Sequence, residues 1–357
     1  MVLAYIVNNS SRSVSVINTK THSVIATIPV TSPGASPNNI AITPDGKLAY
    51  VTNNQIPINN SVTVIDSKTH SVIATINVAN GPSMVAFTPD GKLAYVVNTS
   101  IEGFTERLVT VIDTKTHSII ATVQVGSAPN SVAFTPDGKL AYVVNGASNS
   151  NSVSAIDVKT HSVIATIPVG SLPNRFAISP DGKLAYVTNV TGDSCSVIDT
   201  KTHSVTATIP VGNLPLGVKF TPNGKLAYVV NSNSGGTGSI SAIDVKTHSV
   251  IATIPVGNPS DRPANIAITP DGKFAYVDTL SGDVVTAIDI KTHSVIATIQ
   301  VGNSQSFSFV EFTPDGKFAY VGNSSNGTVS VIDVKTHSVI ATVDVGTRPA
   351  SIAFTPN

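Results

Sequence analysis

The chain has 357 residues, with 21 basic and 21 acidic side chains and a formal net charge of zero. Only 12% of its residues are charged, so a positively charged surface that follows nucleic-acid phosphates is not expected. Its apolar runs are far shorter than the roughly 18 residues of a membrane-spanning helix, so no membrane span is expected. The single cysteine, Cys195, has no partner for an internal disulfide and therefore indicates no redox compartment.

A repeat of about 45 residues dominates the sequence. The triplet Lys-Thr-His occurs eight times, beginning at residues 20, 68, 115, 159, 201, 246, 291 and 335. A unit of this length cannot bury its own apolar faces and must stack on neighbouring units. The repeat therefore has to be interpreted before any single residue.

Each repeat predicts four short β-strands, called here strands a to d. In one complete repeat they lie at residues 82–88, 93–97, 108–113 and 118–125. These segments alternate polar and apolar residues and are rich in Val, Ile, Tyr and Thr, as strands are. Pro89-Asp90-Gly91 predicts a tight turn between a and b, because Pro presets φ and Gly accepts a positive φ. No stretch shows the periodicity of an amphipathic helix.

Eight such repeats predict an all-β fold, an eight-bladed β-propeller with four antiparallel strands per blade. The chain begins at a strand b, Leu3 to Val7, and stops after a strand a, Ser351 to Thr355. We therefore expect the C-terminal strand a to pair with the N-terminal strands b to d and to close the ring. We expect one domain, residues 1–357, with blades at 349–357 with 1–30, 37–78, 82–125, 129–169, 173–211, 215–256, 263–301 and 307–345.

The motifs Leu-Ala-Tyr-Val-Thr-Asn, Ser-Val-Thr-Val-Ile-Asp and Val-Ile-Ala-Thr-Ile resemble the YVTN family of β-propeller repeats over essentially the whole chain. The resemblance implies a surface-layer-like bacterial or archaeal propeller at the cell surface or elsewhere outside the cytoplasm. No signal peptide is visible before the first strand, so this location implies a mature or excised domain. Relatives include surface-layer proteins, binding propellers and lactonase-like or lyase propellers, so the chemistry stays open.

All eight histidines occupy the turn between strands c and d. These turns lie toward the outer part of each blade, so their side chains diverge and cannot converge within the roughly 2 Å bonds of a metal site. We therefore predict a structural role in the turn, which leaves no histidine for the inner strands. The residues are His22, His70, His117, His161, His203, His248, His293 and His337.

The residues that break the repeat are the candidate functional positions. The fifth residue of the innermost strand, strand a, is Ala in six repeats and is Lys219 and Glu311 in the other two. Because an isolated buried charge costs several kcal/mol, these positions predict water, a partner charge or a ligand in the central channel. Their blades are two apart, so the side chains are expected to reach one another, either as a structural salt bridge or within a ligand site.

Further candidates surround these two charges. Asp278 replaces the Val, Thr or Gly of a strand b in the intervening blade, and Arg175 adds a guanidinium able to hold a carboxylate. The residues just after the start of strand a form a variable, polar ring at the channel mouth. From this ring we expect ligand contacts by Asn39, Asn130, Asn174, Asn265 and Phe309.

Two functions fit these positions. The first is a non-catalytic binding or scaffold propeller, a monomer without a cofactor, that binds a protein, glycan or small molecule at the d–a and b–c loops and the channel mouth. The alternative is a metal-dependent lactonase-like hydrolase or lyase, with Ca²⁺ or Mg²⁺ bound by Glu311 and Asp278 and with Lys219 or Glu311 as acid or base. The lack of a spare histidine and of any Ser-His-Asp or Cys-His arrangement favours the first.

Overall fold

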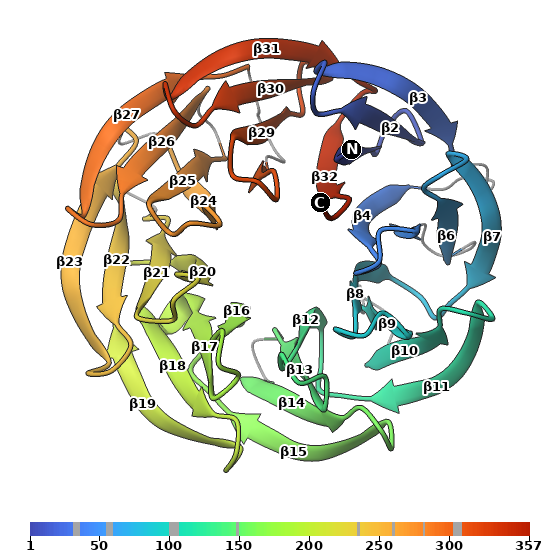
Figure 1. Cartoon of the computed structure of the whole chain (residues 1–357). Coiled ribbons are helices and arrows are strands. Elements are labelled where there is room, and N and C mark those ends of the chain that lie inside the picture. The colour runs from blue at the N-terminus through green and yellow to red at the C-terminus, as the bar shows by residue number, and fades with distance from the viewer. Residues whose placement is uncertain are drawn as a thin grey trace. The chain divides into compact units, whose positions relative to one another are not determined.

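The computed structural model describes residues 1–30, 36–54, 60–99, 107–147, 150–233, 236–258, 261–280, 283–302 and 309–357. The fold is the predicted eight-bladed β-propeller, with four antiparallel strands in each blade (Figure 1). Among the described residues the one helical element is a single 3-10 turn, η1 (Val190–Gly192), so the fold is all-β. No helix of this part of the chain is long and apolar enough to cross a membrane.

The chain divides into two compact units, and the first comprises Met1–Thr166 with Asp344–Asn357. Its four sheets have the strand orders β3-β2-β1-β32, β4-β5-β6-β7, β11-β10-β9-β8 and β12-β13-β14-β15. The strands are β1 (Leu3–Asn8), β2 (Ser13–Asn18), β3 (Ser23–Pro29), β4 (Pro37–Ile42), β5 (Leu48–Asn53), β6 (Ser61–Asp66), β7 (Ser71–Asn77), β8 (Pro82–Phe87), β9 (Leu93–Asn98), β10 (Leu108–Asp113), β11 (Ser118–Gln124), β12 (Pro129–Phe134), β13 (Leu140–Asn145), β14 (Ser152–Asp157), β15 (Ser162–Pro168) and β32 (Pro349–Phe354).

The second unit comprises Ile167–Val343. Its four sheets follow chain order, from β16-β17-β18-β19 to β28-β29-β30-β31. The strands are β16 (Pro173–Ile178), β17 (Leu184–Asn189), β18 (Ser194–Asp199), β19 (Ser204–Pro210), β20 (Pro215–Phe220), β21 (Leu226–Asn231), β22 (Gly238–Asp244), β23 (Ser249–Val256), β24 (Pro263–Ile268), β25 (Phe274–Thr279), β26 (Val284–Asp289), β27 (Ser294–Gln300), β28 (Val310–Phe312), β29 (Phe318–Asn323), β30 (Thr328–Asp333) and β31 (Ser338–Asp344).

The last strand of the chain completes the first sheet. β32 pairs antiparallel with β1, from Ala4 opposite Phe354 to Asn8 opposite Pro349 (Figure 1). This pairing confirms the predicted closure, in which the C-terminal strand a joins the N-terminal strands. It also gives β1 a hydrogen-bonded neighbour on both sides, which removes an open sheet edge.

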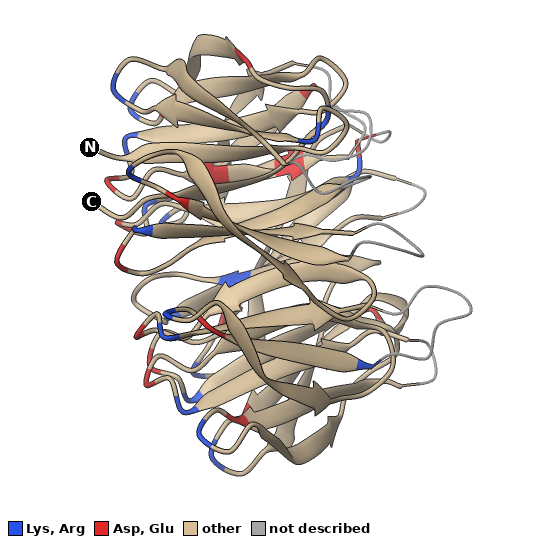
Figure 2. Ribbon diagram, turned by 90° about the vertical axis from the view of Figure 1, so that its right-hand side faces the viewer, with Lys and Arg blue, Asp and Glu red and all other residues tan. Residues whose placement is uncertain are grey.

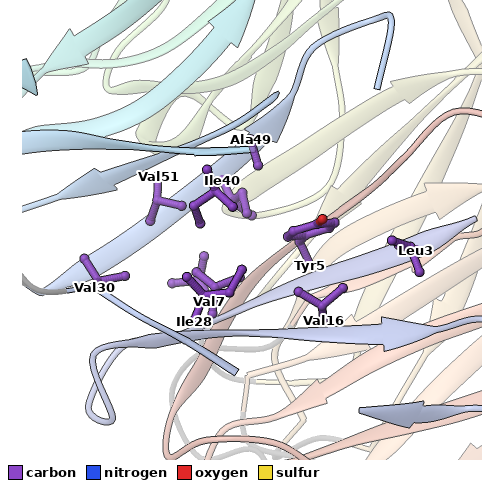
Figure 3. Close-up of a cluster of buried hydrophobic side chains, with 11 residues drawn as sticks. Leu3, Tyr5, Val7, Val16, Ile28, Val30, Ile40, Ala49 and Val51 are labelled. Carbon is purple, nitrogen blue, oxygen red and sulfur yellow. The ribbon is translucent and has the colours of Figure 1, made fainter. Parts of the chain in front are cut away.

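The core lies between neighbouring sheets and is built mainly by strands b and c, with a few residues from strands a and d. In the first unit, Tyr5 and Val7 of β1 lie in one buried cluster with Ile40 of β4 and Val51 of β5 (Figure 3). Burying each aliphatic side chain of this size stabilises the fold by about 1.5–3 kcal/mol. The fourth strand of each sheet instead consists mainly of exposed and half-buried residues, which alternate in β3, because it is the outer edge. Strand a lies at the opposite, inner edge of its sheet (Figure 1).

The c–d turns place every histidine in the left-handed region, with φ between 50° and 56°. Few residues other than Gly adopt this conformation readily. The imidazole compensates by bonding to the buried Tyr of strand b in the preceding blade, as Tyr5 Oη does with His70 Nδ1 at 2.9 Å. Each such bond links two consecutive sheets of one unit. The other described pairs are Tyr50–His117, Tyr95–His161, Tyr186–His248, Tyr228–His293 and Tyr276–His337.

The a–b turns carry most of the exposed ion pairs. In the first of them Thr43 Oγ1 donates to Asp45 Oδ1 at 2.7 Å, and Lys47 Nζ lies 2.9 Å from Asp45 Oδ2. One repeat has Asn223 in place of this Asp, and its Oδ1 accepts the equivalent bond from Thr221 at 2.8 Å. Figure 2 shows that charged residues gather in turns between strands and that the strands themselves are largely uncharged.

Candidate functional site

The candidate site is built on the inner strands, which are β32, β4, β8 and β12 in the first unit and β16, β20, β24 and β28 in the second. We number the positions of strand a so that the fifth lies opposite the Tyr of strand b. In β4, for example, Pro37 is the first position and Ala41 the fifth. β28 is shorter, and its first residue, Val310, is at the fourth position. The third position is the most variable. It holds Asn39, Met84, Ser131, Arg175, Gly217, Asn265, Phe309 and Ser351.

Lys219 and Glu311 occupy the fifth position, opposite Tyr228 and Tyr320. Both side chains are exposed to water, which is one of the three alternatives stated from the sequence. The physical reason is that strand a has no strand beside its inner edge, and a long side chain placed there extends into water. No ion pair within 4.0 Å joins the two in the described part of the chain, so the predicted salt bridge is absent.

Asp278, in β25, is the buried charge of the group, with 1% of its surface exposed. Its Oδ1 accepts from the backbone N of Asn265 at 2.8 Å, and its two oxygens accept from Asn265 Nδ2 at 3.3 and 3.2 Å. In β17 the equivalent residue is Thr188, whose hydroxyl accepts from the backbone N of Arg175 at 3.2 Å. Asp278 thus accepts the same hydrogen bond from the backbone of strand a as Thr188 does, and it adds a negative charge.

Arg175, at the third position of β16, is held by its backbone. Thr188 Oγ1 contacts both its N and its O, and also Leu216 O of the next sheet at 2.9 Å. The side chain is exposed to water, although protein atoms also lie around its guanidinium. This partial burial lowers the pKa of Arg175, and the charge of Asp278 acts in the opposite direction. Because arginine stays protonated, Arg175 is a fixed positive charge within electrostatic reach of Asp278.

The sheet between these two charges has no side chain at the third position. The residue there is Gly217, and a Cβ atom on it would lie 3.1 Å from Ala264 O and 3.4 Å from Val230 Cγ2. The inner strands β20 and β24 therefore approach so closely that a larger residue would require the neighbouring backbone to shift by a few tenths of an ångström.

Phe309 has a packing role. Its carbonyl accepts from Gly322 N at 3.1 Å, and a Cβ atom on Gly322 would lie only 2.4 Å from Phe309 Cε1. The ring therefore fills the space that Val, Thr or Asp278 occupies in the other strands b. A ligand contact by Phe309 stays a prediction, but half of this ring is already used by the fold.

The predicted asparagine ring falls into separate parts. Asn39 connects sheets within the first unit, because its Oδ1 accepts from Val85 N at 3.1 Å and its Nδ2 donates to Ser351 Oγ at 3.4 Å. Asn130, also in the first unit, accepts from the hydroxyl of its neighbour Ser131 at 3.1 Å. In the second unit, half-buried Asn174 precedes Arg175 in β16, and Asn265 contacts Asp278 as described.

The described residues contain no group of three or more His, Cys, Asp or Glu side chains that could hold a metal ion. The only cysteine, Cys195, is completely buried, and this burial raises the pKa of its thiol to about 12. It is therefore inert as a nucleophile.

Two family models match parts of this chain. The Cytochrome D1 heme domain matches residues 99–235, and the seven-bladed β-propeller Lactonase matches residues 212–347. The chain belongs to the β-propeller proteins. Neither model describes the YVTN repeat, so that assignment stays a prediction. No curated protein matches the chain.

Solved structures agree with this assignment of the β-propeller fold. Hydrazine synthase of Kuenenia stuttgartiensis is 26% identical, with a TM-score of 0.68 over 85% of this chain and 96% of its own. A dihydro-heme d1 dehydrogenase in complex with DHE is 18% identical, with a TM-score of 0.81 over 98% of this propeller and 74% of its own chain. A functionally unknown protein from Desulfotomaculum acetoxidans is 16% identical, with a TM-score of 0.68 and 99% coverage of both chains.

The cytochrome D1 match raises the question of whether this propeller fits a haem. Histidine is a common protein ligand of haem iron. All eight histidines of the propeller lie in c–d turns with a positive φ, and in the pairs described above the imidazole is bonded to Tyr. The described inner strands therefore do not fit histidine ligation of a haem iron.

Three residues of the site were not singled out from the sequence: Thr188, Gly217 and Gly322. Thr188 donates a hydrogen bond to Leu216 O of the next sheet. Gly217 allows the close approach of Ala264 O, and Gly322 leaves space for the Phe309 ring. A signal for Gly217 and Gly322 exists in the repeat, since each stands alone as a glycine at its position.

Proposed function

We propose that the protein is a non-catalytic binding protein whose ligand is a small molecule with a carboxylate group, held at the inner strands of the second unit by Arg175 and Lys219. The observation that carries this proposal is the state of Arg175. It is a permanent, exposed charge whose backbone is held by Thr188 and which lies within electrostatic reach of Asp278. A guanidinium binds a carboxylate through two parallel N–H···O bonds, which gives both affinity and orientation.

Lys219 supports the proposal by adding a second positive charge on the next inner strand, β20. The third and fifth positions lie on the same face of a strand, so Arg175 and Lys219 extend from corresponding faces of consecutive sheets. Glu311, exposed on β28, disfavours a ligand that is negative along its whole length. A ligand with carboxylate at one end and neutral or donor groups at the other suits these three charges.

The similar proteins support a small-molecule ligand of this class. The region that matches the Cytochrome D1 heme domain includes Arg175 and Lys219, and haems carry carboxylate side chains. The region that matches the Lactonase model includes Lys219 and Glu311, and opening a lactone produces a carboxylate. In both classes the ligand or product offers the group that Arg175 is suited to bind.

The test is calorimetric titration with succinate, citrate, gluconate and free haem, compared between the natural chain and Arg175→Ala. We expect at least one ligand to bind and the variant to weaken it by about tenfold or more, the effect of losing charge-assisted hydrogen bonds. Arg175→Lys should recover only part of the affinity, because an ammonium cannot form the paired contact. Arg107→Ala in the first unit is the control and should change nothing. Equal affinity in Arg175→Ala would overturn the proposal.

A metal-dependent lactonase-like hydrolase is the second candidate, because the Lactonase match spans Asp278 and Glu311. Glu311 and Asp278 would bind Ca²⁺ or Mg²⁺, and Lys219 or Glu311 would transfer the proton. Lactone opening is to be measured with each cation and with a chelator, together with the unfolding temperature. Turnover that needs the cation and is lost in Glu311→Gln would favour this candidate, whereas no turnover and no cation-dependent shift would rule it out.

The same proposal includes a location outside the cytoplasm or at the cell surface, which the YVTN resemblance implies, and the monomeric state expected from the sequence. Fractionation of the native cells tests the location. Analytical ultracentrifugation tests the monomer, and a stable dimer at low concentration would contradict it.

A further inference from the structure

A cleft in the first unit forms a second candidate site, made by strands β2 and β3 and by residues 344–346. Its volume is about 530 Å³, within the range of roughly 300–1,000 Å³ that small-molecule sites occupy. Its lining comes from strands c and d and from a loop, so it does not include the inner strands of the proposed carboxylate site.

The floor and edge of the cleft are lined with hydroxyl groups. Ser13 and Ser15 of β2 are buried, and Asn8 Nδ2 donates to their hydroxyl oxygens at 3.2 and 2.9 Å. Each serine accepts from Asn8 and so keeps its own proton to donate. Ser11 holds the edge in place, since Thr347 N donates to its Oγ at 2.6 Å, and exposed Thr27 adds a further hydroxyl.

Two opposite charges complete the polar lining. Arg12 and Asp344 are both exposed, and within the described residues neither takes part in an ion pair shorter than 4.0 Å. Arg12 is fixed at the backbone, with φ of 51° and with its carbonyl accepting from Val30 N at 2.9 Å. The cleft therefore has a neutral total charge but offers one strong donor group and one strong acceptor group.

The remaining lining is apolar and small. Val24 and Pro29 of β3, with Val345, supply carbon surface beside the hydroxyl and charged groups. A ligand complementary to this cleft is uncharged, presents several hydroxyls that both donate and accept, and has apolar C–H faces. We propose that the cleft binds a neutral saccharide, with its hydroxyls shared between the guanidinium of Arg12 and the carboxylate of Asp344.

The combination of residues is special to this repeat. Asp344 is the only acidic residue that ends a fourth strand; the corresponding residues elsewhere are Pro, Asn or Gln, or Val256 where the strand is one residue longer. Arg107 occupies the position of Arg12 in another repeat, because Val125 N donates to its carbonyl as Val30 N does to Arg12. The strand end that corresponds to Asp344 for that repeat is Asn77, so Arg107 has no acidic counterpart. It is a matched control.

The experiment uses glucose, galactose, mannose, N-acetylglucosamine and maltose as probes, with saturation-transfer NMR on the full chain followed by titration. We expect at least one probe to bind saturably, and Arg12→Ala and Asp344→Asn each to weaken it by about tenfold or more. Arg107→Ala and Arg175→Ala should leave the affinity unchanged. Unaltered circular dichroism would show that the variants fold.

Two results would overturn this inference. One is that no probe binds saturably to the natural chain. The other is that binding survives both Arg12→Ala and Asp344→Asn, or is lost in Arg175→Ala, which would place the saccharide elsewhere. Because Arg175 carries the proposed carboxylate site, its variant distinguishes failure of that proposal from failure of this one.

Discussion

The inner strands of the two units differ at the fifth position, which is the same residue throughout the first unit and varies in the second. In the first unit the fifth position is Ala41, Ala86, Ala133 or Ala353. In the second unit two of the four strands instead carry Lys219 and Glu311, and the third position includes Arg175 and Gly217. Strands b, c and d keep nearly the same pattern in both units. Variation is therefore concentrated on the innermost strand, which is one of the two edge strands of each sheet.

The largest effect is expected where the units are alike. Tyr50→Ala in the first unit and Tyr276→Ala in the second each remove a completely buried ring and its bond to the next histidine. Each should lower the free energy of unfolding by about 3–5 kcal/mol, and the corresponding change to Phe by about 1 kcal/mol. Urea unfolding followed by circular dichroism measures both. A much smaller loss in one unit would break the equivalence of the two.

A second prediction concerns a packing solution found only in the second unit. Gly322→Val places a side chain where the Phe309 ring lies, 2.4 Å from a Cβ atom, and should cost about 1–3 kcal/mol of unfolding free energy. Adding Phe309→Ala removes the obstruction, so the double variant should be more stable than Gly322→Val alone. Thermal unfolding of the two single variants and the double variant tests this. Strictly additive losses would show that the ring and the glycine are not coupled.

The a–b turns provide a third, smaller comparison. The hydroxyl of Thr43, followed by Lys47, lowers the pKa of Asp45 from 3.8 to about 2. A carboxyl whose pKa is lower in the folded chain stabilises the fold above its unfolded value and loses that contribution as pH falls through the folded value. The unfolding temperature should therefore fall between pH 4 and pH 2, and less steeply in Asp45→Asn.

The natural Asn223 of the second unit gives the reverse test of the same turn. Asn223→Asp should introduce the acid dependence and place a carboxylate beside Lys225. At neutral pH the gain should be no more than a few tenths of a kcal/mol, because the six equivalent ion pairs are exposed to water and salt. A parallel loss of stability with pH in the natural and variant chains would contradict the assignment.

The smallest effect on stability is expected at the residues that distinguish the units most. Lys219→Ala and Glu311→Ala remove exposed side chains and should change the free energy of unfolding by less than about 0.5 kcal/mol. Lys219→Ala should nevertheless weaken carboxylate binding. Chemical unfolding and titration of the same samples measure the two effects. A loss of several kcal/mol would show that these charges have structural partners.

The fold was predictable because the sequence states the same strand pattern many times. The alternation of Leu93 to Val97, the turn at Pro89 to Gly91 and the incomplete repeats at the two chain ends give the strands, the blades and the pairing of β32 with β1. The residues within each turn are sufficient to predict that turn, because hydrogen bonds inside it satisfy its backbone groups, as Gly91 N does with Thr88 O. The prediction of the fold therefore depends little on any single residue.

The site was less predictable because exposure depends on what lies beyond the strand. The sequence indicates that Lys219 and Glu311 share a position, but it does not decide between water, a partner charge and a ligand as their surroundings. The close approach at Gly217 was also not predictable, because this residue has no side chain to interpret. The Tyr–His bonds join residues 61 to 67 positions apart, although their constant separation is itself a signal in the sequence.

Each described Tyr–His bond joins one repeat to the following one, so a repeat presents its phenol in one chain direction and its imidazole in the other. A duplication or deletion of one whole period adds or removes one of each. The remaining phenols then still face an imidazole, and no buried hydroxyl loses its partner. Genes with this repeat can therefore change their number of blades in single steps, whereas a change of half a period would leave a mismatch at the junction.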